Sequence, residues 1–234
     1  MNTIIFKKQD LKNIHNIKKE NIKCFENEII ENLYNEYHNK EIIDYRIYEC
    51  NQEEYFYLDL SNMKLDNTKL YSIFNDENVK TLLNKIEMLD LSNNNISKFP
   101  DYISNYSNIK YLNISNNNIN GIIEVNNIIE LECSNNIIEG ILSISLNVLN
   151  CENNKINNIY CPNITILEIN DNDINELPIL KNIEQLNIVN TKIKKIDYIK
   201  SLKELKCSTK IISKDYRIKN ISFVNSIYYI DFNI

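Results

Sequence analysis

One short pattern of apolar residues recurs along most of the chain and limits the fold more than any other feature. Read from Ile86, it has apolar residues at positions 1, 4, 6 and 11 and asparagine at position 9, as in Leu89, Leu91 and Asn94. A period of about 20 residues predicts a solenoid, because each unit is too small to bury its apolar face alone. Eight copies, the first and last weaker than the others, begin at Tyr55, Ile86, Ile109, Ile128, Leu146, Ile164, Ile183 and Leu202.

The spacing inside each copy predicts a short strand. Positions 4 and 6, such as Leu89 and Leu91, are two residues apart, so their side chains fall on one face of an extended segment. Successive strands of this kind stack into a parallel sheet with a spacing of about 4.8 Å. Burial of each inward side chain then contributes roughly 1.5–3 kcal/mol, and neighbouring coils share that stabilisation.

The pattern resembles the leucine-rich repeat, LxxLxLxxNxL, in which isoleucine can replace leucine and cysteine can take position 6. The resemblance implies an α/β solenoid of horseshoe shape, with the parallel sheet on its concave face, and it implies that the protein binds other proteins. It also implies that the position-9 asparagine bonds the backbone of the turn after each strand. This predicted ladder consists of Asn94, Asn117, Asn136, Asn154 and Asn172, and is broken at its margins by Met63, Thr191 and Lys210.

The residues between the strands predict how each coil closes. Repeats of 18 or 19 residues leave little room for a helix, so most convex segments are expected to be extended or 3₁₀. The longer first interval can hold a helix over 67–83, where apolar residues such as Leu70, Phe74 and Leu83 have suitable spacing. A further apolar column at position 14 is expected to point inward, and it contains Phe99, Ile122, Ile141, Ile159, Leu177 and Ile196.

Residues 1–54 contain no repeat. Apolar residues at steps of three to five between Ile14 and Tyr37 predict an amphipathic helix, and the alternation over 43–47 predicts a strand. We interpret this segment as a cap over the exposed core of the first coil, which solenoids require. The alternative is a small adaptor or targeting domain.

The C-terminal residues also lack the repeat. Apolar alternation over 221–224 and 227–232 predicts one or two closing strands. The predicted organisation is an N-terminal cap over 1–54, leucine-rich repeats over 55–213 and capping strands over 214–234.

The repeat frame determines which strand residues point away from the core. Positions 3 and 5 alternate with the inward positions 4 and 6, so their side chains face outward on the concave side. On the outward positions 2, 3, 5, 7 and 8, ten acidic residues oppose three lysines, a difference of −7 beside a net charge of −6 for the chain. Such a face suits a basic or mixed partner, or it merely keeps the sheet soluble. The candidate partner-binding residues are Tyr57, Asp59, Met88, Asp90, Tyr111, Glu130, Glu132, Val148, Ile166 and Glu168.

Little in the sequence supports chemistry at a metal or a nucleophile. Cys133 and Cys151 share position 6 on adjacent coils, where a metal or redox pair is conceivable, but a buried cysteine more often packs as a small apolar residue. The histidines are His15 and His38, and no Ser–His–Asp or Cys–His arrangement can be argued from them. We therefore expect no catalytic residue, no metal and no cofactor.

The bulk composition limits which classes of function and which cellular locations are expected. The net charge of −6 argues against a nucleic-acid partner, and the chain has neither a signal-peptide core nor an apolar run of about 20 residues. These features favour a cytoplasmic monomer that uses no nucleic acid and no membrane. We predict a non-enzymatic protein–protein interaction module, or scaffold. The alternatives are a regulatory or adaptor subunit of an enzyme complex, of phosphatase or ubiquitin-ligase type, and an enzyme of unrecognised type built around His15 or His38.

Overall fold

The computed structural model describes residues 38–47, 50, 57–208, 218–224 and 227–232. The chain divides into two compact units, 1–44 and 45–234, and the repeats belong to the second. The amphipathic helix predicted between Ile14 and Tyr37 lies outside the described residues, as do Tyr55 and Lys210.

Residues 38–47 form a helix, so the prediction of a strand over 43–47 is wrong. The alternation that suggested a strand also places Ile43 and Ile47 four residues apart, which is the spacing of one helical face. Over five residues the two periods cannot be separated.

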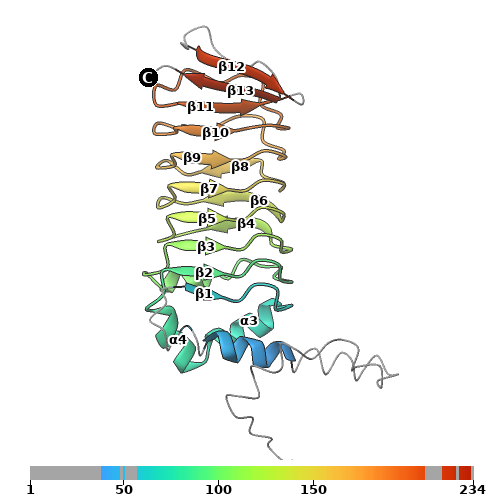
Figure 1. Ribbon diagram of the computed structural model, residues 1–234, viewed down its shortest axis with the longest axis vertical. Helices are drawn as coiled ribbons and strands as arrows, with labels where there is room; N and C mark the ends of the chain where they lie inside the picture. Colours follow the sequence, from blue (N-terminus) through green and yellow to red (C-terminus); the bar gives the residue numbers. More distant parts are fainter. Residues whose placement is uncertain (1–37, 48–49, 51–56, 209–217, 225–226, 233–234) are drawn as a thin grey trace, which may run out of the picture. The chain divides into compact units, whose positions relative to one another are not determined.

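Eight parallel strands, one from each repeat, form a single sheet in the described part of the chain (Figure 1). Their registers align position 4 of every repeat, so that Leu89 pairs with Leu58 on one side and Leu112 on the other. The predicted parallel-sheet solenoid is therefore confirmed. The strands are β1 (Tyr57–Asp59), β2 (Met88–Asp90), β3 (Tyr111–Asn113), β5 (Glu130–Glu132), β7 (Val148–Asn150), β9 (Ile166–Glu168), β10 (Gln185–Asn187) and β11 (Glu204–Cys207).

The interior of the coils is filled by the predicted apolar columns. The position-4 leucines are between 0 and 2% exposed, and the position-6 residues from Leu91 to Cys207 are equally buried. Each coil contributes only a few of these side chains, and the coils above and below cover them. This sharing is why the repeat is stable only as a stack.

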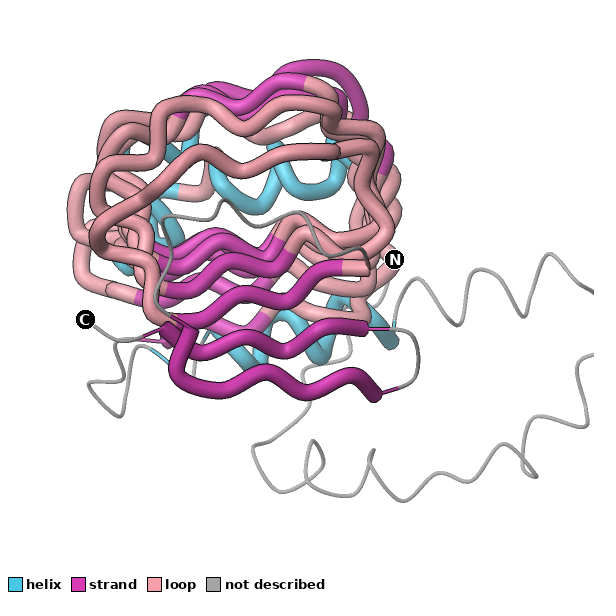
Figure 2. The backbone as a smooth tube through the Cα atoms, turned by 90° about the horizontal axis from the view of Figure 1, so that it is seen from above, coloured by secondary structure: helices cyan, strands magenta, loops and turns pink. Residues whose placement is uncertain are grey.

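The return side of the coils is mostly non-helical, as the repeat length predicted. Three short strands form a second parallel sheet, and Figure 2 shows it across the coil from the main sheet. A 3₁₀ helix, η2 (Asp101–Asn105), closes the second coil. The strands are β4 (Asn120–Glu124), β6 (Ile137–Leu142) and β8 (Asn158–Tyr160).

The first interval holds two helices where one was predicted over 67–83. These are α3 (Asn67–Phe74) and α4 (Glu77–Leu83). The Asp76 carboxylate accepts the N–H groups of Asn78 and Val79, which makes it an N-cap and starts a new helix. No helix among the described residues is long and apolar enough to cross a bilayer.

The prediction that the apolar column at position 14 points inward is only partly correct. Ile141, Ile159 and Ile196 are buried, whereas Ile122 is 64% exposed and its neighbour Ile123 points inward at 2%. The β4–β6 ladder shifts register after Gly121, which has a φ of +76° that suits glycine. After this shift Ile123, and not Ile122, pairs with the buried Ile141 of β6. Phe99 and Leu177 are half-buried.

Position 8 of the repeat has the same backbone conformation in turn after turn, a feature that was not predicted from the sequence. Seven successive repeats place asparagine or aspartate there in the left-handed region, with φ between 51° and 59°. These two residue types tolerate that conformation better than other non-glycine residues. The residues are Asn62, Asn93, Asn116, Asn135, Asn153, Asp171 and Asn190.

Replacing Asn116 tests the cost of this conformation. Asn116→Gly should leave stability within about 0.5 kcal/mol of the parent, whereas Asn116→Val should lower it by roughly 1–2 kcal/mol because a β-branched residue is strained at positive φ. Asn118→Val, at an exposed site outside the positive-φ positions, is the control. Equal urea midpoints for the two Asn116 variants would contradict the assignment.

Two antiparallel strands continue the main sheet beyond the last repeat. β13 (Ile227–Phe232) pairs with β11, and β12 (Ile218–Val224) pairs with β13. Ile230 and Phe232 are buried, so β13 covers apolar surface of the last repeat that would otherwise be exposed to solvent. Both segments predicted to form closing strands, 221–224 and 227–232, lie within these elements.

Candidate protein-interaction surface

The outward residues of the eight parallel strands form two straight columns, which we call the strand face. Strand pairing places the position-3 residues in register from β1 to β11 and does the same for the position-5 residues. All ten candidate partner-binding residues belong to these columns. The position-3 candidates are Tyr57, Met88, Tyr111, Glu130, Val148 and Ile166, and the position-5 candidates are Asp59, Asp90, Glu132 and Glu168.

The position-9 asparagines lie behind the strand face, where each one links two coils. In Asn136, Nδ2 donates to the carbonyl oxygens of Cys133 at 3.1 Å and Ser134 at 3.2 Å in its own turn. The same nitrogen reaches the Ile114 carbonyl of the preceding coil at 3.0 Å, and Oδ1 accepts the Ile119 N–H at 3.0 Å. Equivalent bonds form at Asn94, Asn117, Asn154 and Asn172.

Several position-5 side chains of the strand face accept hydrogen bonds from the backbone of the turn that follows their strand. This role was not predicted from the sequence. Asp90 Oδ1 accepts the N–H of Ser92, two residues later, at 2.8 Å, and Asp59 accepts the N–H of Ser61 at 2.8 Å. This is the local turn that aspartate and asparagine favour. The signal was present, because five of the eight position-5 residues are of these types. Corresponding bonds form at Asn113, Asn150 and Asn187.

At the first strands, polar contacts join neighbouring coils across the strand face. The Tyr57 hydroxyl donates to Asp90 Oδ2 at 3.5 Å, and Asn113 Nδ2 donates to the same oxygen at 3.3 Å. Partial burial, followed by the negative charges of Asp59 and Asp90, raises the pKa of Tyr57 to about 12. Tyr57 therefore stays neutral and acts as a hydrogen-bond donor at neutral pH.

The middle of the strand face is the most acidic part. Burial raises the pKa of the Glu132 carboxyl, and the charges of Glu168, Glu130 and Glu152 raise it further, against a hydrogen bond with Asn150 that lowers it. Four carboxylates therefore interact within a few strands. None of Glu87, Asp90, Glu130, Glu132 and Glu152, which we call the acidic centre, forms an ion pair with a described residue.

Cations neutralise the strand face toward its two ends. At the first strand, Arg46 donates to Asp59 Oδ1 at 3.1 Å and to the Ser61 carbonyl at 3.0 Å. Near the last strands, Lys203 pairs with Glu184 at 2.6 Å, and Lys206 lies 3.9 Å from Glu168. The charge is consequently less evenly spread than the sequence suggested.

The apolar candidates on the strand face differ in exposure. Tyr57 is 42% exposed and Met88 is 40% exposed, whereas Tyr111, Val148 and Ile166 are half-buried between their neighbours. Tyr57 and Met88 are paired in adjacent strands, β1 and β2, so they form one small apolar patch beside the acidic centre.

The cysteines described by the structure are buried and reduced. Burial raises the pKa of the Cys161 thiol to about 12 and raises those of Cys133 and Cys151 still further, so none is a reactive thiolate near neutral pH. No group of three or more histidine, cysteine or carboxylate side chains in the described ranges could hold a metal ion.

The repeat sequence, the aligned strands and the asparagine ladder together define a leucine-rich-repeat solenoid. No protein-family model matches the sequence, and no curated protein matches it.

Solved structures that are similar to this chain include the following two. One is the leucine-rich repeat domain of APL1B, with 19% identity, a TM-score of 0.47, and 54% of this chain and 43% of that chain covered. Another is the LRIM1/APL1C complex, with 14% identity, a TM-score of 0.34, and 61% and 47% covered. This chain thus spans less than half the length of either matched chain.

Proposed function

We propose that this protein is a non-enzymatic interaction module that binds a basic segment of another protein on the strand face. The acidic centre is the observation that carries the proposal. Its five carboxylates lie on or beside strands β2 to β7 and form no ion pair with a described residue, although lysine or arginine pairs with acids at both ends of the same face. Lysine and arginine from a partner would meet negative charge there that no described cation pairs with.

The apolar patch of Tyr57 and Met88 adds a second element to this surface. Interfaces commonly place aromatic and methionine side chains at their desolvated core, with charged residues around them. The eight strands extend over about 34 Å at 4.8 Å each, which is long enough for an interface of ordinary size.

A charge reversal at two outward acids tests this function. Glu130→Lys/Glu152→Lys should reduce capture of partner proteins from source cells by at least about tenfold, because like charges would then face a basic partner. Both residues avoid the turn bonds that tie Asp59 and Asp90 to the backbone. Quantitative mass spectrometry of affinity-purified samples provides the measurement.

The matched control is Glu124→Lys/Glu139→Lys, which makes the same change of charge at exposed sites of the return-side sheet. It should retain the partners. Recovery of the same partners by the Glu130/Glu152 variant, at parental amounts, would show that the strand face is not the binding surface.

A further inference from the structure

A hollow of about 840 Å³ lies on the return side between two neighbouring coils, lined by 175–181, Lys192 and 194–200. The return-side sheet stops at β8, one coil earlier. Pro178 occupies the repeat position of Leu142 and Tyr160, and a proline has no N–H with which to continue a ladder. Without that ladder, the two return segments leave open space of the size that ordinary ligand sites have.

The hollow is basic in a protein that is acidic overall. Five lysines and two carboxylates line it, a net charge of +3 beside −6 for the chain. Lys192 pairs with Asp173 outside the lining, and Lys195 pairs with Asp197. The other three lysines of the hollow form no ion pair with any residue that the structure describes. These are Lys181, Lys194 and Lys200.

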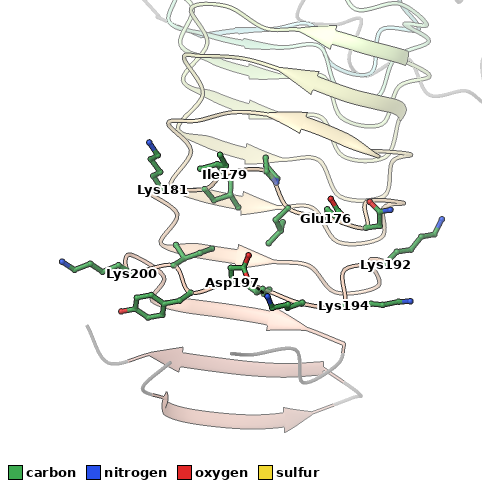
Figure 3. Close-up of a pocket in the computed structure, with 15 residues that line it drawn as sticks. Glu176, Ile179, Lys181, Lys192, Lys194, Asp197 and Lys200 are labelled. Atoms are coloured by element: carbon green, nitrogen blue, oxygen red, sulfur yellow. Dashed lines mark ion pairs between the residues drawn. The ribbon is translucent and has the colours of Figure 1, made fainter. Parts of the chain in front are cut away.

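Apolar side chains lie between these lysines. Ile179 is 78% exposed and Tyr198 is 55% exposed, and both line the hollow. Figure 3 shows Lys181 and Lys200 at one end and Lys192 and Lys194 at the other, with Ile179 between them. The surface thus presents positive charge at two ends, and between them lie Ile179 and the carboxylates of Glu176 and Asp197.

We propose that this hollow binds an acidic peptide segment of another protein, with one bulky apolar side chain flanked by carboxylates. The carboxylates would meet the lysines at both ends, and the apolar side chain would cover Ile179 and Tyr198. A continuous phosphate backbone fits less well, because it would also place negative charge beside Glu176 and Asp197 in the middle of the hollow, where the proposed peptide has its apolar side chain. This site is separate from the strand face and has the opposite charge preference.

The probe is a fluorescein-labelled nonapeptide of glutamates with a central leucine, measured by fluorescence anisotropy at near-physiological salt. The parent should bind it saturably, with a Kd below about 100 µM. Lys181→Glu/Lys194→Glu/Lys200→Glu should weaken binding by at least about tenfold. The matched control is Lys85→Glu/Lys98→Glu/Lys155→Glu, at three other exposed lysines, and it should bind within about twofold of the parent.

Further variants and peptides measure the contribution of the apolar contact to binding and test whether the strand face takes part in it. Ile179→Asp, or a peptide with serine in place of leucine, should weaken binding several-fold. Glu130→Lys/Glu152→Lys should bind the acidic peptide like the parent, so failure of the proposed function and failure of this site give different results.

Four results would overturn the proposal. They are absence of saturable binding by the parent, equal loss in the control triple variant, equal affinity for the leucine and serine peptides, and tighter binding of a single-stranded oligonucleotide than of the peptide. Concentration-dependent self-association that the Lys181/Lys194/Lys200 variant abolishes, without peptide binding, would instead assign the hollow to a second copy of this chain.

Discussion

Leu149→Asp is expected to destabilise the solenoid by more than about 4 kcal/mol, the largest effect of any substitution considered. Leu149 has no exposed surface, and its strand neighbours Leu131 and Leu167 are at most 1% exposed. A carboxylate there would lie among apolar side chains with no cation. For a chain of this size the loss corresponds to a fall in Tm of roughly 8–16 °C or more.

The effect should also spread to adjacent coils, since each coil stabilises its neighbours. Hydrogen exchange should therefore accelerate in β5 and β9 as well as in β7. Val148→Asp is the matched control, because the adjacent side chain points outward and is half-buried. If the two variants melt alike in circular dichroism, the assigned register of β7 is wrong.

Asn136→Ala is expected to cost about 2–4 kcal/mol, the second largest effect, and to lower the Tm by roughly 4–16 °C. The substitution removes the three bonds donated by Nδ2 and leaves the N–H of buried Ile119 without its acceptor. An unsatisfied buried group accounts for much of that cost. Differential scanning calorimetry measures the change.

Asn157→Ala serves as the control for Asn136→Ala, because Asn157 is an exposed asparagine on the return side. It should change the free energy of unfolding by less than about 0.5 kcal/mol. A similarly small effect at Asn136 would mean that the ladder contributes little to holding the coils together.

The parts of the fold that were predictable are those in which spacing along the chain determines the outcome. The leucine at position 4 lies inward in every coil because a shift of one residue would turn the whole apolar set to solvent. The same logic failed where two patterns fit equally well. Residues 43–47 form a helix despite their alternation, and Ile123 replaces Ile122 in the core, where it pairs with Ile141 of β6.

The strand face illustrates the same division for the candidate site. Its membership followed from the repeat frame, but the roles of its residues did not. Asp59 and Asp90 bond their own turns, and this left Glu130 and Glu152 as the better residues for a test of charge. The Asp59 partner, Arg46, lies outside the repeats and has no spacing that would connect the two.

By itself, the sequence determined the coil register, the interior columns at positions 4 and 6 and the set of side chains that face outward on the strands, because successive side chains of an extended backbone point to opposite faces. Only the tertiary structure decided which charges are paired and where space remains. Lys203 meets Glu184 through the stacking of β10 and β11, and the hollow at Pro178 arises between two coils. Such contacts depend on the distances between segments that lie far apart in the sequence, and no local sequence pattern specifies those distances.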